Sequence, residues 1–186
     1  MPYLHCDVET RSAIPIADCG SHRYINDTSF SLLLLSYAID DGDVKLVDFT
    51  RGDDDTEFRE MLRNPEYIKV AWNASFERGV FTHVYGDCAP PEQWRDAMVL
   101  AASCGLPLSL GQCSAALCLP QDAAKDKAGR DLIRRFCVPK KDGSFNDPAA
   151  DPERWAQFCE YNRQDVVAEL DAAQQTEQEG GAWRGQ

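Results

Sequence analysis

Two carboxylates lie two residues apart in a short apolar segment near the start of the chain, residues 4–10. In an extended strand successive side chains alternate between faces, so Asp7 and Glu9 emerge on the same side while the apolar residues take the other. Adjacent carboxylates repel one another unless a proton or a cation lies between them, and oxygen ligands without thiolates suit Mg²⁺ or Mn²⁺. The pair therefore predicts either a divalent metal site or an edge strand with a solvated polar face.

A third acid falls on the apolar side of a predicted helix that starts near Asn73. At 100° per residue, Glu77 lies in the middle of that side. A carboxylate aimed into a core costs several kcal/mol unless it is paired or bound to a metal. The alternative is a helix rolled so that Glu77 reaches solvent. The apolar residues that share this side are Phe76, Val80, Phe81 and Val84.

A fourth acid accompanies a phenol on the long C-terminal helix predicted from Pro152 to about residue 175. Tyr161 and Asp165 are four residues apart and so share one helix face with Phe158, Ala168 and Ala172. Such a pair is common in helices with a purely structural role. The joint presence of acids on three inward faces is what favours a metal site, because the strand and the two helices can converge.

Composition points to one globular domain of 186 residues, with 44% hydrophobic and 27% charged residues. No apolar run is long enough to span a bilayer, and the N-terminus lacks the basic and apolar regions of a secretory signal. The eight cysteines form no Cys-x-x-Cys pair and have no histidines at zinc-ligand spacing. We expect a reduced, cytoplasmic protein with no membrane partner.

The net charge of −12 argues against a nucleic-acid-binding protein unless the charge is unevenly distributed. Residues 125–141 carry seven basic and two acidic side chains, a local net charge of +5 by subtraction. A basic strip in an acidic chain would suit a metal enzyme that acts on a polyanion, with acids at the ions and basic residues at the backbone. The alternative is an ordinary solvated helix face.

The remaining patterns predict an α/β domain over residues 1–176 and a flexible tail over 177–186. Residues 11–29 are expected to form a loop, and Asp41-Gly42 a hairpin turn. Strands are expected at 4–10, 30–39, 44–49, 68–72 and 93–95. Helices are expected after residues 53–56, from Asn73, and at 97–103, 108–117, 127–137 and 152–175.

Three segments resemble the exonuclease motifs of the DEDD superfamily in order and approximate spacing: Asp7-Val8-Glu9-Thr10, the stretch Asn73-Ala74-Ser75-Phe76-Glu77-Arg78-Gly79, and Tyr161-Asn162-Arg163-Gln164-Asp165. Tyr161 precedes Asp165 by four residues, and Glu160 stands where the histidine subtype needs histidine, so the third motif resembles the tyrosine subtype. The chain is similar to the 3′–5′ proofreading domains of family A DNA polymerases, particularly those of phages and prophages. The segments 23–30, 96–98 and 127–133 also resemble that group, and the resemblance extends over residues 3 to about 175.

The resemblance implies an RNase H-like mixed sheet of about five strands, one of them antiparallel, flanked by helices. It also implies two Mg²⁺ or Mn²⁺ ions, held by Asp7, Glu9, Glu77 and Asp165, with Tyr161 orienting the attacking water. Its implied substrate is the 3′ end of single-stranded or frayed DNA, from which nucleoside monophosphates are released. A DNA polymerase domain or subunit is a further implied partner. The substrate-binding residues it implies are Thr10, Asn73, Phe76, Lys127, Arg130 and Arg134.

The chain departs from the family pattern at Glu77, because the second motif usually ends in aspartate. The extra methylene moves the carboxylate outward and could weaken or reposition the second ion. An RNA-trimming exonuclease of the same superfamily and a catalytically weakened module that binds nucleic acid or a polymerase therefore remain as alternatives. The chain carries no polymerase domain, so we expect a free-standing exonuclease or an excised domain.

Overall fold

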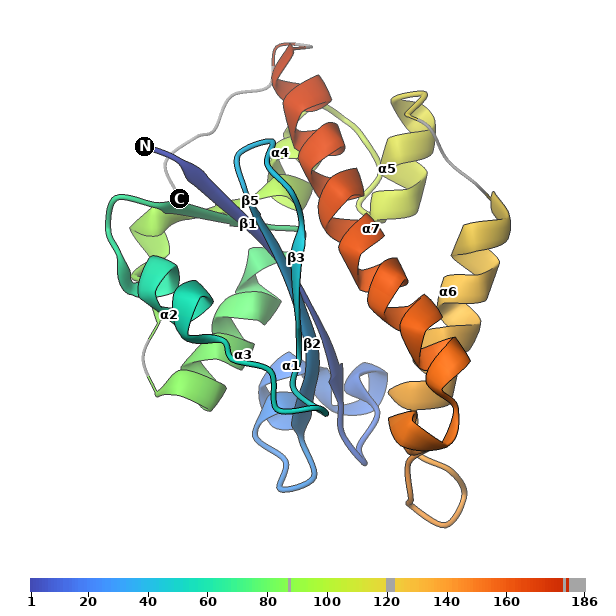
Figure 1. Ribbon diagram of the computed structural model, residues 1–186. Helices are drawn as coiled ribbons and strands as arrows, with labels where there is room; N and C mark the ends of the chain where they lie inside the picture. Colours follow the sequence, from blue (N-terminus) through green and yellow to red (C-terminus); the bar gives the residue numbers. More distant parts are fainter. Residues whose placement is uncertain (87, 120–122, 179, 181–186) are drawn as a thin grey trace.

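A five-stranded mixed sheet forms the centre of the described part of the chain (Figure 1). The computed structural model describes residues 1–86, 88–119, 123–178 and 180, with side chains at all of these except 123–127. The strands lie in the order β3-β2-β1-β4-β5. Strand β2 is antiparallel to both neighbours, whereas β1, β4 and β5 are parallel. One strand therefore opposes the other four, which confirms the predicted RNase H-like sheet. The strands are β1 (Tyr3–Arg11), β2 (Ser31–Ile39), β3 (Lys45–Asp48), β4 (Ile68–Ala71) and β5 (Trp94–Asp96).

Helices cover both faces of the sheet. The long helix α7 crosses one face against β1 and β2 and is itself contacted by α4, α5 and α6, while α2 and α3 pack on the other face (Figure 1). Among the described helices, none has the length and apolar character that crossing a membrane requires. The helices are α1 (Ile16–Ile25), α2 (Thr56–Arg63), α3 (Ala74–Tyr85), α4 (Ala97–Ser103), α5 (Leu110–Ala116), α6 (Ala123–Phe136) and α7 (Pro152–Gln178), with short 3₁₀ turns at Pro91–Gln93 and Pro148–Ala150.

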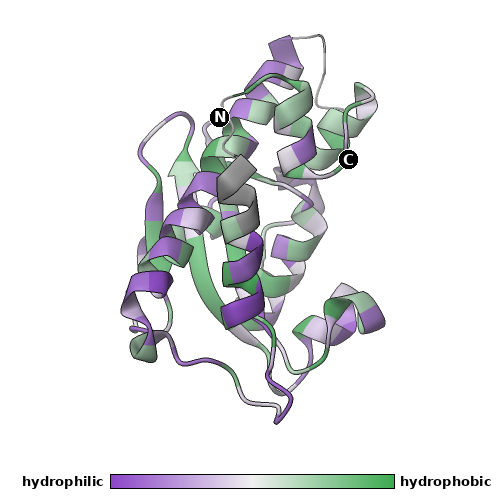
Figure 2. Cartoon of the chain, turned by 90° about the vertical axis from the view of Figure 1, so that its right-hand side faces the viewer, coloured by the Kyte–Doolittle hydropathy of each residue, from purple (hydrophilic) through white to green (hydrophobic). Residues whose placement is uncertain are grey.

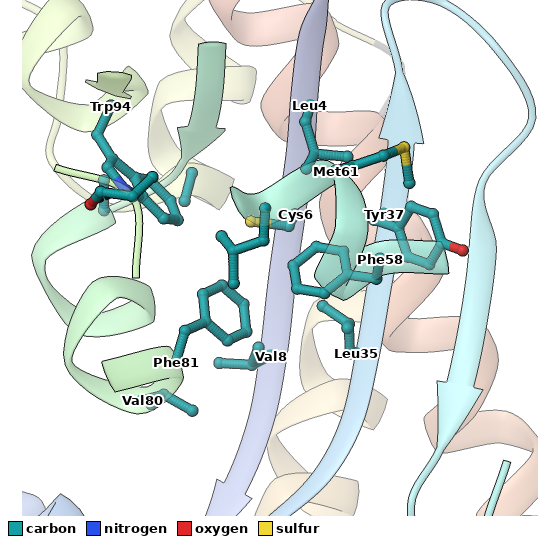
Figure 3. Close-up of a cluster of buried hydrophobic side chains, with 14 of the residues drawn as sticks. Leu4, Cys6, Val8, Leu35, Tyr37, Phe58, Met61, Val80, Phe81 and Trp94 are labelled. Atoms are coloured by element: carbon teal, nitrogen blue, oxygen red, sulfur yellow. Dashed lines mark hydrogen bonds between the residues drawn. The ribbon is translucent and has the colours of Figure 1, made fainter. Parts of the chain in front are cut away.

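Strand β1 divides its side chains between the two faces as the alternation predicts. Leu4, Cys6 and Val8 are buried against α2 and α3, where Phe58 and Phe81 lie 5.1 Å apart between ring centroids (Figure 3). Fully burying a large apolar side chain contributes roughly 1.5–3 kcal/mol. This packing fixes the register of β1, and therefore directs its alternate residues toward α7.

A second apolar cluster holds α6 and α7 against β2 on the opposite face. Phe136 of α6 meets Trp155 of α7 edge-to-face, with ring centroids 4.9 Å apart. The indole Nε1 of Trp155 donates a 2.6 Å hydrogen bond to the Asp48 carboxylate on β3. The helices of this face turn hydrophilic surfaces outward over the hydrophobic strands (Figure 2). The C-terminal helix is thus anchored where it crosses the sheet.

The prediction of a loop over residues 11–29 is wrong, because α1 occupies Ile16–Ile25. The helix is interrupted at Gly20, whose φ is +74° and ψ is 165°. The sequence of this helix has no clear helical period, because Pro15 precedes it, Gly20 interrupts it, and its polar and apolar residues are poorly separated. The apolar face predicted for α3 is also partly wrong, since Val84 is 40% exposed. It lies in the last turn of the helix, beyond the core.

The start of α6 and the end of α7 differ most from the predicted helix bounds. Helix α6 begins at Ala123 rather than at residue 127, and α7 continues to Gln178, so the first two residues of the predicted tail are helical. Residues 179 and 181–186 of that tail lie outside the described part of the chain, and the domain boundary at 176 stays a prediction. All eight cysteines are free thiols, as their spacing predicts.

Candidate active site

Three carboxylates converge where β1 passes under α7. Asp7 and Glu9 project from the α7-facing side of β1, and Asp165 projects from α7 toward them. One carboxylate oxygen from each lies within 4.8 Å of the others. We call these three residues the carboxylate cluster. The structure thus brings together three of the four acids that the motifs single out.

The fourth acid, Glu77, reaches the same region from the edge of β1. Strand β4 pairs with β1 only as far as His5 opposite Val70, so the edge of β1 beyond that point is open to the start of α3. Asn73 makes the turn into α3 with a left-handed backbone, φ +69°. Glu77 is 3% exposed, and its Oε2 has no hydrogen-bond partner among the described residues. The rolled helix that would have exposed Glu77 is therefore wrong.

Burial and mutual repulsion keep these carboxyl groups from ionising easily. Burial, followed by the charge of Asp165, raises the pKa of Asp7 and of Glu9 well above the ordinary range. Burial, followed by the charges of Glu169 and Asp96, raises the pKa of Glu77 well above its ordinary range. Divalent cations would relieve this repulsion, since they favour the ionised carboxylates. Oxygen-rich ligands around an unpartnered buried oxygen fit Mg²⁺ or Mn²⁺.

Tyr161 stands beside the carboxylate cluster with a phenol that stays protonated. Burial, the charges of Asp165 and Glu9 and a hydrogen bond with Asp165 raise its pKa far above 10. Its ring stacks parallel to Phe158, with an interplanar angle of 9°. On the other side α6 approaches closely at Gly129. An added Cβ there would lie 2.6 Å from Cδ2 of the Tyr161 ring, and closer still to Cε2. Only glycine lets α6 and the tyrosine ring occupy these positions.

Substitution of Gly129 by alanine should therefore displace Tyr161. We expect the exonuclease activity that the three motifs predict to fall about 10-fold, a loss of about 1.4 kcal/mol in transition-state stabilisation. We expect a loss of stability of about 1–3 kcal/mol from overpacking, partly offset by the better helix propensity of alanine. Kinetic assays and thermal melts of Gly129→Ala measure both effects.

The matched control removes the ring that the new methyl group would meet. In a Tyr161→Ala background, Gly129→Ala should no longer destabilise the protein, because the two effects are coupled through one contact. Equal destabilisation in both backgrounds would contradict the assigned contact.

Two of the predicted substrate-binding residues, Thr10 and Phe76, line a cavity beside Glu9. The cavity has a volume of about 330 Å³ and extends between β1, α1 and the end of α6. The hydroxyl groups of Thr10 and Tyr24 are 3.1 Å apart and can hydrogen bond with each other. Asn73 does not line the cavity, and its Oδ1 accepts a hydrogen bond from Ser75.

The predicted basic strip is only partly tested by the structure. Arg130 and Arg134 are exposed on α6, and neither lines the cavity beside Glu9. Arg134 also forms an exposed ion pair with Asp131, with an N–O distance of 3.3 Å. The Lys127 side chain lies outside the described part of the chain. Contact of these residues with a phosphate backbone stays a prediction.

Several residues that support the site were missed in the sequence. The Nδ2 of Asn162 donates to Asp7 at 2.6 Å, and the Cys137 thiol lies 3.9 Å from Oε2 of Glu9. His5 hydrogen bonds with Glu169 at 2.9 Å inside the protein. Glu169 follows Asp165 by four residues on the inward face of α7, a spacing that could have pointed to it. For Cys137 no local pattern exists, because the contact is made across the fold.

Comparisons with known proteins give a sequence relative and solved structures of the same fold. No family model matches the chain. It is 39% identical over 176 residues to a DNA polymerase of Bacillus phage SP02, an alignment that covers 91% of this chain and 27% of the polymerase. The chain thus spans about a quarter of that relative's length.

Two solved structures share the fold across almost the whole chain. Escherichia coli RNase D, described as an exoribonuclease involved in structured RNA processing, matches with a TM-score of 0.59 and 23% identity over 97% of this chain and 41% of its own. Brucella melitensis NrnC with bound Mg²⁺ matches with a TM-score of 0.58 and 17% identity over 96% of this chain and 75% of its own. The chain therefore shares its fold with these two proteins. This shared fold and the phage relative support the resemblance of the three motifs to the DEDD superfamily, and the carboxylate cluster is made of acids from the first and third motifs.

Proposed function

We propose that this protein is a metal-dependent 3′–5′ exonuclease that hydrolyses single-stranded or frayed DNA ends and releases nucleoside monophosphates. The observation that carries the proposal is the carboxylate cluster, with three ligand oxygens within 4.8 Å. The unpartnered buried oxygen of Glu77 supports it, because such an oxygen costs stability unless it has a ligand.

The proposed mechanism assigns a separate task to each side chain. Asp7, Glu9 and Asp165 would hold one Mg²⁺ or Mn²⁺, and Glu77 with Asp7 would hold a second. When bound, such ions activate water and stabilise the leaving oxygen of a phosphodiester. The Tyr161 phenol stays protonated at neutral pH, and it would orient the attacking water by a hydrogen bond in exchange for the one it makes with Asp165.

The substrate would enter through the cavity beside Glu9. Its largely apolar walls include Phe76 and Ile133, against which a terminal base can pack while water is excluded. DNA is the proposed substrate because the sequence relative is a phage DNA polymerase, and a polymerase domain or subunit is the proposed partner. RNA remains the second candidate, since RNase D, with the same fold, is an exoribonuclease.

A time course on single strands labelled at the 5′ end tests the proposal. With Mg²⁺ or Mn²⁺ we expect a ladder that shortens from the 3′ end, and with EDTA we expect no cleavage. An RNA strand of the same sequence, run in parallel, should be shortened more slowly. Faster cleavage of the RNA strand would make RNA the substrate in place of DNA. Binding of the strand without cleavage, with either Mg²⁺ or Mn²⁺, would favour a catalytically weakened binding module.

The raised pKa values predict how pH and metal affect stability. Asp7, Glu9 and Glu77 have folded-state pKa values above those of the unfolded chain, so above about pH 4 the folded metal-free protein holds more protons than the unfolded chain. The stability of the metal-free protein should therefore fall as pH rises from about 4 through the folded-state values. Mg²⁺ should raise Tm more at about pH 8 than at about pH 5.

Calorimetric melts with Mg²⁺ and with EDTA measure this effect. Asp7→Asn should reduce both the pH-dependent loss and the Mg²⁺ gain. A metal-free Tm that rises steadily from about pH 5 to about pH 8 would contradict the assigned shifts.

A further inference from the structure

Asp7 faces a second polar residue across the sheet. In the β1–β2 register Asp7 is directly opposite Ser36, a fully buried residue that follows four consecutive leucines of β2. Side chains directly opposite one another in a sheet project from the same face. Both therefore point toward α7, which crosses this part of the sheet.

One side chain of α7, Asn162, bridges the pair. Asn162 is fully buried, and its Oδ1 accepts a 2.6 Å hydrogen bond from Oγ of Ser36 while its Nδ2 donates a 2.6 Å hydrogen bond to Oδ2 of Asp7. A carboxamide has one acceptor and one donor end, so the two contacts fix its orientation. The hydroxyl occupies the acceptor end, and the amide hydrogens face the carboxylate.

The surroundings of Asp7 explain why such a contact is needed. Among the described residues, the charges that raise its pKa are the carboxylates of Asp165, Glu9, Glu77 and Glu169. Repulsion from these four carboxylates favours an orientation of the Asp7 carboxylate that points away from them. A hydrogen bond donated to an ionised carboxylate is among the stronger ones, and here it comes from a neutral group that would not compete for a cation.

We propose that Ser36 and Asn162 form a hydrogen-bond relay that positions the Asp7 carboxylate for metal binding. The inference rests on the proposed function insofar as Asp7 is a metal ligand. Asn162 is a positioning residue, because it acts through Asp7 and holds Oδ2 of that carboxylate. A purely structural Asn162 would contribute to stability but not to metal affinity.

Metal binding without substrate separates these two roles. Mn²⁺ affinity would be measured by titration calorimetry for the full chain and for Asn162→Leu, Ser36→Ala and the double variant. We expect Asn162→Leu to weaken Mn²⁺ binding about 10-fold, as is usual when the partner of a metal ligand is removed. Ser36→Ala should have a smaller effect, about 3-fold, and should add nothing in the Asn162→Leu background, because the relay is already broken.

Two controls complete the experiment. Asn146→Leu removes an asparagine that donates to the Arg135 carbonyl outside the site at 2.7 Å, and should lower stability without changing Mn²⁺ affinity. Asp7→Asn should lose most of the Mn²⁺ binding. If Asn162→Leu does not fold, Ser36→Ala decides alone: weaker Mn²⁺ binding supports the relay and unchanged binding overturns it.

Unchanged affinity in folded Asn162→Leu, or independent losses that multiply in the double variant, would also overturn the relay. Failure of the proposed function looks different, since the wild-type protein would then bind Mn²⁺ and show the relay but cleave no nucleic acid.

Discussion

Substitution of Asp7 or of Asp165 by asparagine is expected to lower exonuclease activity by roughly 10³-fold, a loss of about 4 kcal/mol in transition-state stabilisation. Each change keeps the shape of the side chain but removes one negative charge from a group whose ligand oxygens lie within 4.8 Å. Single-turnover assays with excess enzyme measure the chemical step directly and separate it from substrate binding.

Stability should move in the opposite direction. Loss of one charge relieves repulsion among partly buried carboxylates, so the metal-free variants should melt at or above the wild-type temperature. The matched control is Asp171→Asn, which lies outside the site on α7, the helix that carries Asp165, and should retain activity. Full activity in Asp7→Asn, or an equal loss of activity in Asp171→Asn, would show that the carboxylate cluster is not required for catalysis.

Substitution of Glu77 by glutamine is expected to lower activity by roughly 10²-fold, about 2.7 kcal/mol, while stabilising the metal-free protein by about 1 kcal/mol. The carboxylate is buried among negative charges with an unpartnered oxygen, so neutralising it removes a cost that only a cation would offset. For a domain of this size the gain corresponds to about 2–4 °C in Tm.

Comparison of melts with and without Mg²⁺ makes the test sharper. Wild-type protein should gain more from Mg²⁺ than Glu77→Gln does, because the variant has lost one ligand. Glu60→Gln, exposed on α2, should change neither activity nor the Mg²⁺ effect. A fully active Glu77→Gln would show that the second motif is dispensable in this chain.

The strands and the faces that carry the site acids could be predicted because their determinants are local, whereas the RNase H-like arrangement of the sheet followed from the resemblance. Alternation on β1 is sufficient to separate Asp7 and Glu9 from the core residues between them, and the structure has this arrangement. The four-residue spacing of Tyr161 and Asp165 likewise fixes a shared helix face.

The unpredicted features depend on where distant elements meet. The relay through Asn162 needs the pairing of β1 with β2 and the crossing of α7, neither of which the sequence specifies locally. The helix wheel could not decide whether Glu77 is buried. Its burial depends on how far β4 pairs along β1, because the unpaired part of β1 is open to the start of α3. Helix α1 was missed because its kink at Gly20 and its mixed faces carry no clear period.

The most direct test of the central claim is the identity of the first product released from a single strand labelled at its 3′ end. Wild-type protein with Mg²⁺ should release the label at once as a nucleoside monophosphate, and neither EDTA-treated protein nor Asp7→Asn should do so. A first labelled product longer than one nucleotide, or release that persists in EDTA, would contradict a metal-dependent 3′–5′ exonuclease.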